Sequence, residues 1–85
     1  MKKRYYGVSL EELNLSFIEG GHMSEDGHFF KLTDEDKELM ISFSKASKEL
    51  FGNTLHGVEL NIEGDLELWR DIERRIRVKI ARPGG

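Results

Sequence analysis

The stretch from Thr33 to Gly52, TDEDKELMISFSKASKELFG, most constrains what this chain can fold into, because it carries the markers of one long helix. Thr33 can accept the first free backbone amides, and the acidic residues after it place negative charge at the positive end of the helix dipole. Gly52 suits the left-handed residue that closes a helix. The sequence therefore predicts a single long helix over about 34–51.

Apolar residues recur through this stretch at helical spacing. The stripe consists of residues at offsets of four, three and four, widened by two neighbours: Leu39, Phe43, Ala46 and Leu50, with Met40 and Phe51 beside them. An amphipathic helix buries such a stripe against the rest of its domain. The flanking segments resemble strands and turns, so we expect a sheet packed on this helix.

The N-terminal third contains two apolar alternations that are out of phase. Residues 4–10 alternate as a strand with one buried face does, and a second alternation covers 13–18. Between them the phase slips at Glu11 and Glu12. A bulge would explain the slip, and so would a single helical turn capped by Ser9 with Glu12 three residues later; the sequence leaves both open.

The remaining segments predict further strands around the long helix. The loop EGGHMSEDG at 19–27 contains two turn signals, so strand 13–18 should fold back onto a strand at 28–32. Residues 57–63 alternate cleanly and predict a half-buried strand. Asp65 can cap a short helix over about 66–73, with a strand as the alternative reading.

The chain then ends in an alternating segment that predicts a last strand over 76–80. If this strand lay beside strand 57–63, its cations would face Glu59 and Glu63. The predicted fold is α+β, with a four- or five-stranded mixed or antiparallel sheet on one long helix. It is one domain spanning 1–85, with 83–85 as a flexible tail.

Composition limits the class of protein. The chain has 85 residues, 38% apolar and 34% charged, with a formal net charge of −3. This balance argues against a general nucleic-acid binder, since neutralising phosphates needs a basic excess. Cys is absent, which fits a reducing compartment. Neither a signal peptide nor a membrane-spanning stretch is recognisable, so we expect a cytoplasmic domain.

The sequence supplies no recognisable catalytic or metal-binding motif. His22, His28 and His56 have metal-ligand side chains, but their spacing fits no standard zinc pattern. No nucleophile elbow or phosphate-binding loop is present. We therefore predict a protein that is not an enzyme and that uses no metal or cofactor.

A local excess of basic residues near the C-terminus is the clearest candidate surface. Such a cluster can bind an acidic partner, or it can protect an edge strand from aggregation. Tyr5 adds an aromatic side chain, a type enriched at protein interfaces. The candidate partner surface consists of Tyr5, Arg75, Arg77, Lys79 and Arg82.

The final residues, ERRIRVKIARPGG, combine a charged turn, an alternating strand and a Gly-Gly end. This ending resembles the last strand and tail of ubiquitin-like proteins, and the predicted order of elements resembles their β-grasp fold. The resemblance covers about 57–85 in residues and the rest in element order only. It implies that Gly84 and Gly85 would form a conjugated or thiocarboxylated end.

These observations lead to three hypotheses of function. The first is a non-enzymatic protein-interaction domain, of the adaptor or inhibitor type, that binds another protein through its surface. The second is a ubiquitin-like modifier or sulfur carrier that acts through Gly84 and Gly85. The third is a small nucleic-acid-binding module that uses the basic last strand.

Overall fold

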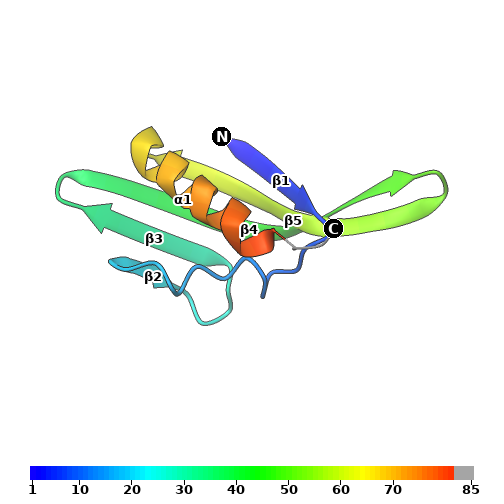
Figure 1. The fold of residues 1–85 in the computed structure, drawn as a ribbon, viewed down its shortest axis with the longest axis horizontal. Helices are drawn as coiled ribbons and strands as arrows, with labels where there is room; N and C mark the ends of the chain where they lie inside the picture. Colours follow the sequence, from blue (N-terminus) through cyan, green and yellow to red (C-terminus); the bar gives the residue numbers. More distant parts are fainter. Residues whose placement is uncertain (82–85) are drawn as a thin grey trace.

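The protein folds into one antiparallel sheet with a helix at its C-terminal end (Figure 1). The computed structural model describes residues 1–81. Its elements are β1 (Lys2–Tyr6), β2 (Gly21–Met23), β3 (Phe29–Asp34), β4 (Lys37–Leu50), β5 (Asn53–Gly64) and α1 (Leu66–Ile80). The five strands are ordered β1-β5-β4-β3-β2, and all neighbours are antiparallel. The α+β class predicted from the sequence is confirmed.

The predicted long helix at 34–51 is wrong, because this stretch forms the β3–β4 turn and the whole of β4. Leu39, Ile41 and Phe43 alternate with exposed or half-buried residues, and each is at most 3% exposed. An alternation of period two buries these side chains on one face of a sheet, where strand pairing also satisfies the backbone. Leu39 and Phe43 are four residues apart, a spacing that fits one face of a helix and also one face of a strand. The pairing of β4 in the sheet decides between the two.

Gly52 shows why the end of the stretch was misread. It has φ +80°, the left-handed conformation expected of a residue that closes a helix. Here, however, it follows Phe51, at φ +52°, in the two-residue turn between β4 and β5. Two consecutive positive φ values are typical of the hairpin turn whose twist matches that of paired strands. Gly52 therefore forms part of a hairpin turn and does not end a helix.

The segment after β5 is one helix, so the predicted strand 76–80 is also wrong. The Asp65 carboxylate caps α1 by accepting hydrogen bonds from the amides of Glu67 and Leu68, at 2.9 and 3.0 Å. The predicted short helix therefore exists, but it continues to Ile80. Its buried side chains Trp69, Ile72 and Ile76 lie on one stripe. This stripe favours a helix, and it leaves Val78 exposed to solvent.

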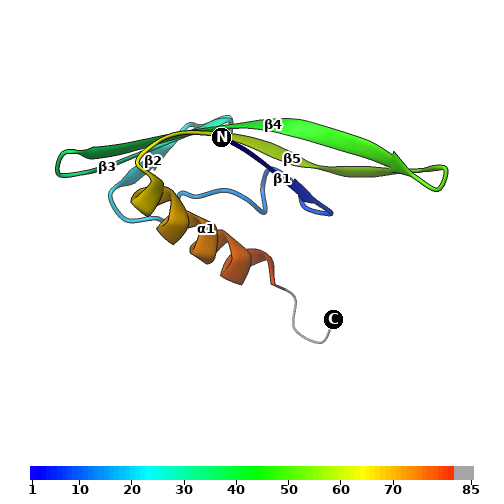
Figure 2. The ribbon, with the colours of Figure 1, turned by 90° about the horizontal axis from the view of Figure 1, so that it is seen from above.

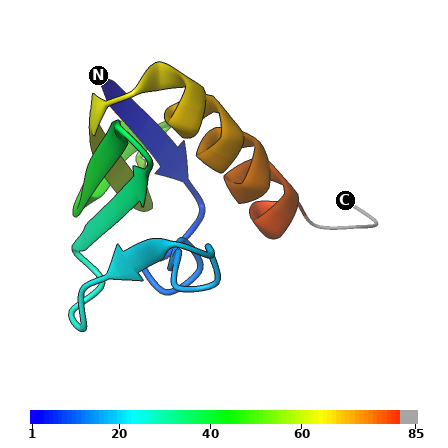
Figure 3. The ribbon, with the colours of Figure 1, turned by 90° about the vertical axis from the view of Figure 1, so that its left-hand side faces the viewer.

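One core lies between the sheet and the segments on one side of it. Figures 2 and 3 show α1 on a single side of the sheet, and Figure 2 shows the loop after β1 on the same side. Strand β5 contains the predicted alternation, which is confirmed: Val58, Leu60 and Ile62 are buried. These side chains form one cluster with the buried stripe of α1.

The loop between β1 and β2 replaces the predicted strand 13–18 and the second half of the predicted strand 4–10. Strand β1 ends at Tyr6, and no strand forms over 13–18, although Leu13, Leu15 and Ile18 are buried in the core. The phase slip is a turn in which the Ser9 hydroxyl accepts from the Glu12 amide and the Glu12 carboxylate accepts from the Ser9 amide. This reciprocal pair of hydrogen bonds is the one expected for a helical turn capped by Ser9, which was one of the two alternatives; the other was a bulge.

The β-grasp arrangement expected from the resemblance is not confirmed. The predicted order has a long helix before the last two strands, whereas the single helix of the described residues follows all five strands. The Gly-Gly end lies outside the described residues.

Candidate functional site

Strands β4 and β5 extend well beyond the rest of the sheet as a two-stranded arm, which we define as residues 44–56. The β3 ladder ends on β4 at Ser42, and the β1 ladder ends on β5 at Gly57. Figures 1 and 2 show the arm projecting away from α1, and the molecule measures 47 Å along its longest axis against 26 and 24 Å. All arm residues except the half-buried Ala46 are exposed.

The tip of the arm presents an aromatic side chain to solvent. Phe51 is 94% exposed, and it is followed by Gly52 in the turn. A bulky residue with positive φ is uncommon, because Asn, Asp or Gly adopt this conformation at lower cost. Leu50 and Leu55 are also exposed, at 49% and 38%. The tip therefore combines exposed apolar side chains with a Phe held at a positive φ that bulky residues rarely adopt.

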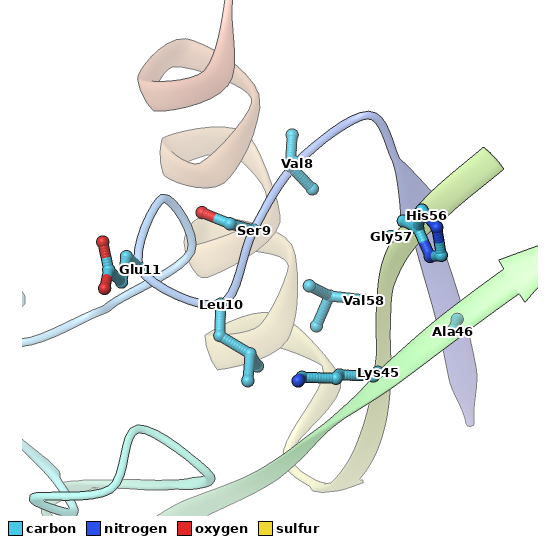
Figure 4. A pocket seen from close by; sticks show the side chains of 9 residues that line it. All are labelled: Val8, Ser9, Leu10, Glu11, Lys45, Ala46, His56, Gly57 and Val58. Atoms are coloured by element: carbon cyan, nitrogen blue, oxygen red, sulfur yellow. The ribbon is translucent and has the colours of Figure 1, made fainter.

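A hollow of about 540 Å³ lies where the arm leaves the body (Figure 4). Its walls come from the loop after β1 and from strands β4 and β5, and they include Val8, Leu10 and Val58. Lys45 lies on the arm side of this hollow, opposite Leu10 in the view of Figure 4. The hollow can accept an apolar side chain, and a cation stands at its edge.

A second hollow, of about 590 Å³, lies against the outer surface of α1. It is lined by Phe17 and Val78 together with three basic residues: Arg74, Arg75 and Lys79. The Lys79 ammonium lies 4.7 Å from the centroid of the Phe17 ring and donates a hydrogen bond to the Asn14 carbonyl at 2.5 Å. This patch is apolar at its centre and positively charged around it.

Arg75, Arg77 and Lys79 lie on α1 instead of on the predicted strand, and the helix places them on different sides. Arg75 and Lys79 are one helical turn apart and line the second hollow. Arg77 lies on another flank, where its guanidinium is 3.5 Å from the Glu73 carboxylate. Glu73 also pairs with Lys3 of β1 at 3.4 Å. Arg82, Gly84 and Gly85 lie outside the described residues.

The predicted pairing of Glu59 with the last strand is also wrong, because that strand does not exist. Glu59 instead pairs with Arg4 of β1, with 2.8 Å between Nε and Oε1. This hydrogen bond raises the pKa of Arg4 above its usual value. Opposite charges do face each other across the ladder, but between β1 and β5.

Tyr5 lies on the core face of β1, opposite Val58, and is half-buried. Its hydroxyl oxygen is buried and has no hydrogen-bond partner. Burial raises the pKa of the Tyr5 phenol, and the nearby Glu73 carboxylate raises it further, whereas Arg77 lowers it. The structure therefore brings Tyr5 near Arg77, but leaves its hydroxyl enclosed by the protein.

The three histidines lie in separate parts of the fold. His22 is in β2, His56 is in the arm, and the His28 Nδ1 donates to the Phe43 carbonyl at 2.9 Å. Within residues 1–81, no group of three His, Asp or Glu side chains is arranged to hold a metal ion. The same residues contain no helix with the length and apolar character needed to cross a membrane.

Sequence reasoning missed the arm tip, because it placed Phe51 at the end of a helix. The signal that could have revealed the tip is Gly52-Asn53, a pair of turn-forming residues that lies between the segments SKASKEL and TLHGVEL. A turn residue between two such segments is typical of a hairpin. Comparison with known proteins adds no family, since no family model, curated protein or solved structure matches this chain.

Proposed function

We propose that this protein is a small non-enzymatic domain that binds another protein through the tip of its β4–β5 arm. The observation that carries the proposal is Phe51, which is 94% exposed in a backbone conformation that disfavours it. Residues held in such conformations without a structural benefit are enriched at functional sites. Exposed aromatic side chains are also frequent anchors of protein interfaces.

The shape of the arm supports the same proposal. A two-stranded projection can enter a cleft of another protein and present Phe51 first, with Leu50 and Leu55 behind it. Aromatic side chains bury a large area with few rotatable bonds, which suits a contact that must be ordered on binding. The partner surface complementary to this tip is an apolar pocket.

The replacement of Phe51 by Asn tests this function, because Asn tolerates positive φ. If the aromatic ring has no role, Phe51→Asn should be neutral in binding and should stabilise the fold by about 1 kcal/mol. If the ring is the anchor, the same variant should gain stability and lose its partner. Both cases predict a gain in stability, so the loss of partner binding is the result that shows the ring to be the anchor.

The measurement is affinity capture from a lysate of the source organism, with quantitative mass spectrometry of the captured proteins. The matched control is Phe29→Thr, which removes another exposed Phe, 60% exposed on β3, and keeps β propensity. We expect the proteins captured by the wild type to persist with Phe29→Thr and to disappear with Phe51→Asn. The same captured set with Phe51→Asn would overturn the proposal.

A further inference from the structure

The arm has a free backbone edge along β4. The β3 ladder ends at Ser42, and the last bond to that side runs from the Phe43 amide to the His28 carbonyl, at 2.8 Å. Beyond this point β4 continues to Leu50, where the turn begins. Among the described residues, no strand pairs with β4 on this side over residues 44–50. Such an edge is a template for another strand.

The outward groups of this edge follow from the direction of the Phe43 amide. In an antiparallel strand, the N–H and C=O of alternate residues point to the same side. Because the Phe43 amide points towards β3, the backbone groups of Lys45, Ser47 and Glu49 point to the same side, which is unoccupied there. The central one of these residues, Ser47, is also the midpoint of the free segment 44–50.

The side chains of this edge are self-complementary about Ser47. Two copies paired antiparallel about this residue would set Lys45 of each copy opposite Glu49 of the other. Lys48 would lie opposite Ala46, so no like charges would be directly opposite. Neither Lys45 nor Glu49 makes an ion pair within the described chain. Opposite charges that face each other across a ladder stabilise it, and they fix its register.

Two neighbouring registers lack this complementarity. Pairing centred on Lys48 would set two Lys48 side chains directly opposite each other. Pairing centred on Ala46 would bring Leu50 of the second copy to the level of Ser42, a position that Phe29 of β3 already occupies. The arrangement centred on Ser47 uses the whole free edge and avoids both conflicts.

We propose that the β4 edge of the arm, residues 44–50, binds a second copy of this chain antiparallel about Ser47 and joins the two sheets. The occupant is a second copy because the charges are complementary to themselves in this register. The inference does not depend on the proposed function, since Phe51 lies outside the paired segment.

Charge reversal tests the interface without altering the core. Lys45→Glu would set like charges opposite each other at two symmetric positions, and so would Glu49→Lys. Each variant should weaken self-association by about tenfold or more. A mixture of the two variants restores both opposite-charge pairs, so the heterodimer should form about tenfold or more tightly than the homodimer of either variant alone. The double variant K45E/E49K should dimerise like the wild type.

The measurement is sedimentation equilibrium from micromolar to millimolar protein, with circular dichroism to verify the fold. The matched control is Lys48→Glu, which makes the same change of net charge on the same edge but faces Ala46. We expect this variant to dimerise. A wild-type chain that stays monomeric at millimolar concentration would overturn the inference. So would a dimer that resists Lys45→Glu, since it would use another surface.

Discussion

The two halves of the β4–β5 hairpin have the same backbone pairing but differ in what supports them. In the body, Leu39, Ile41 and Phe43 point into the core and are at most 3% exposed. In the arm, the positions on the same face are occupied by polar residues, Lys45, Ser47 and Glu49, which are exposed. The ladder continues without interruption from one half to the other. The two strands therefore stay paired in the arm, although the side chains there are no longer buried.

This difference shows which part of the molecule is available for binding. Burial of apolar side chains supplies most of the stability of a small domain, and only the body half contributes to it. An isolated two-stranded hairpin is marginally stable in water, so the arm depends on the body for its order. Its side chains are not needed for the core. They are free to form an interface.

The largest contrast is expected between two leucines of β5. Leu60 is fully buried in the body, whereas Leu55 is 38% exposed in the arm. Leu60→Ala should lower the free energy of unfolding by about 2–5 kcal/mol, because it removes buried methyl groups and leaves a cavity. Leu55→Ala should change it by about 0.5 kcal/mol or less. Urea denaturation measures both, and equal losses would contradict the separation of body and arm.

A second contrast compares two glycines, one where the arm begins and one at its tip. A Cβ at Gly57 would overlap the Tyr5 carbonyl oxygen and approach the Tyr6 backbone, whereas one at Gly52 would meet no atom within 4 Å. Gly57→Ala should therefore cost about 2 kcal/mol, because β1 must move away from β5. Gly52→Ala should cost about 1 kcal/mol through its positive φ. Thermal denaturation measures both variants. A smaller loss of stability in Gly57→Ala than in Gly52→Ala would contradict the close approach of β1.

The sequence predicted the elements that have a single unambiguous period. Strand 57–63 was correct because alternation there competes with no helical spacing. For the segment after Asp65 the sequence left a short helix and a strand open, and the structure selects the helix that Asp65 caps. The class α+β was correct, although the long helix on which that prediction rested is a strand and the helix of the described residues lies after β5. The buried loop over 13–18 was missed because its alternation resembles that of a strand.

The stretches that fit two periods could not be assigned from one sequence. Leu39 and Phe43 satisfy both helical and strand spacing, and only the pairing of β4 with β5, which sets Leu39 opposite Gly64 and Phe43 opposite Leu60, decides between them. Ile76 and Ile80 are likewise compatible with a strand, and the packing of Ile76 in the core selects a helix. Phe51 was hidden by the first of these errors. Tertiary contacts override local pattern in such segments.

Within the body, Tyr5→Phe should stabilise the fold by about 1 kcal/mol at neutral pH, because it removes a buried hydroxyl that has no partner. The raised pKa of Tyr5 means that folding favours the protonated phenol. The protonated phenol therefore contributes stability at neutral pH, and this stability is lost as the pH rises through the pKa of Tyr5 in the folded state. The variant should therefore also lose less stability at alkaline pH.

The control for Tyr5→Phe is Tyr6→Phe, on the opposite face of β1, where Lys48 of the arm lies 4.5 Å from the Tyr6 ring centroid. This variant keeps the ring, so we expect no gain in stability. Denaturation at several pH values measures both variants. A loss of stability in Tyr5→Phe would mean that its hydroxyl has a partner in solution.

Removing the whole arm is also expected to have only a small effect on stability. Ala46 and Gly57 are paired across the hairpin, so residues 47–56 can be replaced by Asn-Gly, which favours a two-residue hairpin turn. Because the removed residues are exposed, the free energy of unfolding should change by about 1 kcal/mol or less. Urea denaturation and circular dichroism measure this change.

The shortened chain also separates stability from both proposed interactions. It lacks Phe51 and most of the free β4 edge, so it should capture no partner and should not dimerise while its body remains folded. The control is a chain of full length with Phe51→Asn, which should lose the partner but keep self-association. If removing the arm unfolded the protein, the arm would be part of the folding unit, and the contrast between the two halves of the hairpin would not hold. If the shortened chain folded and still dimerised, the dimer would lie on another surface of the body.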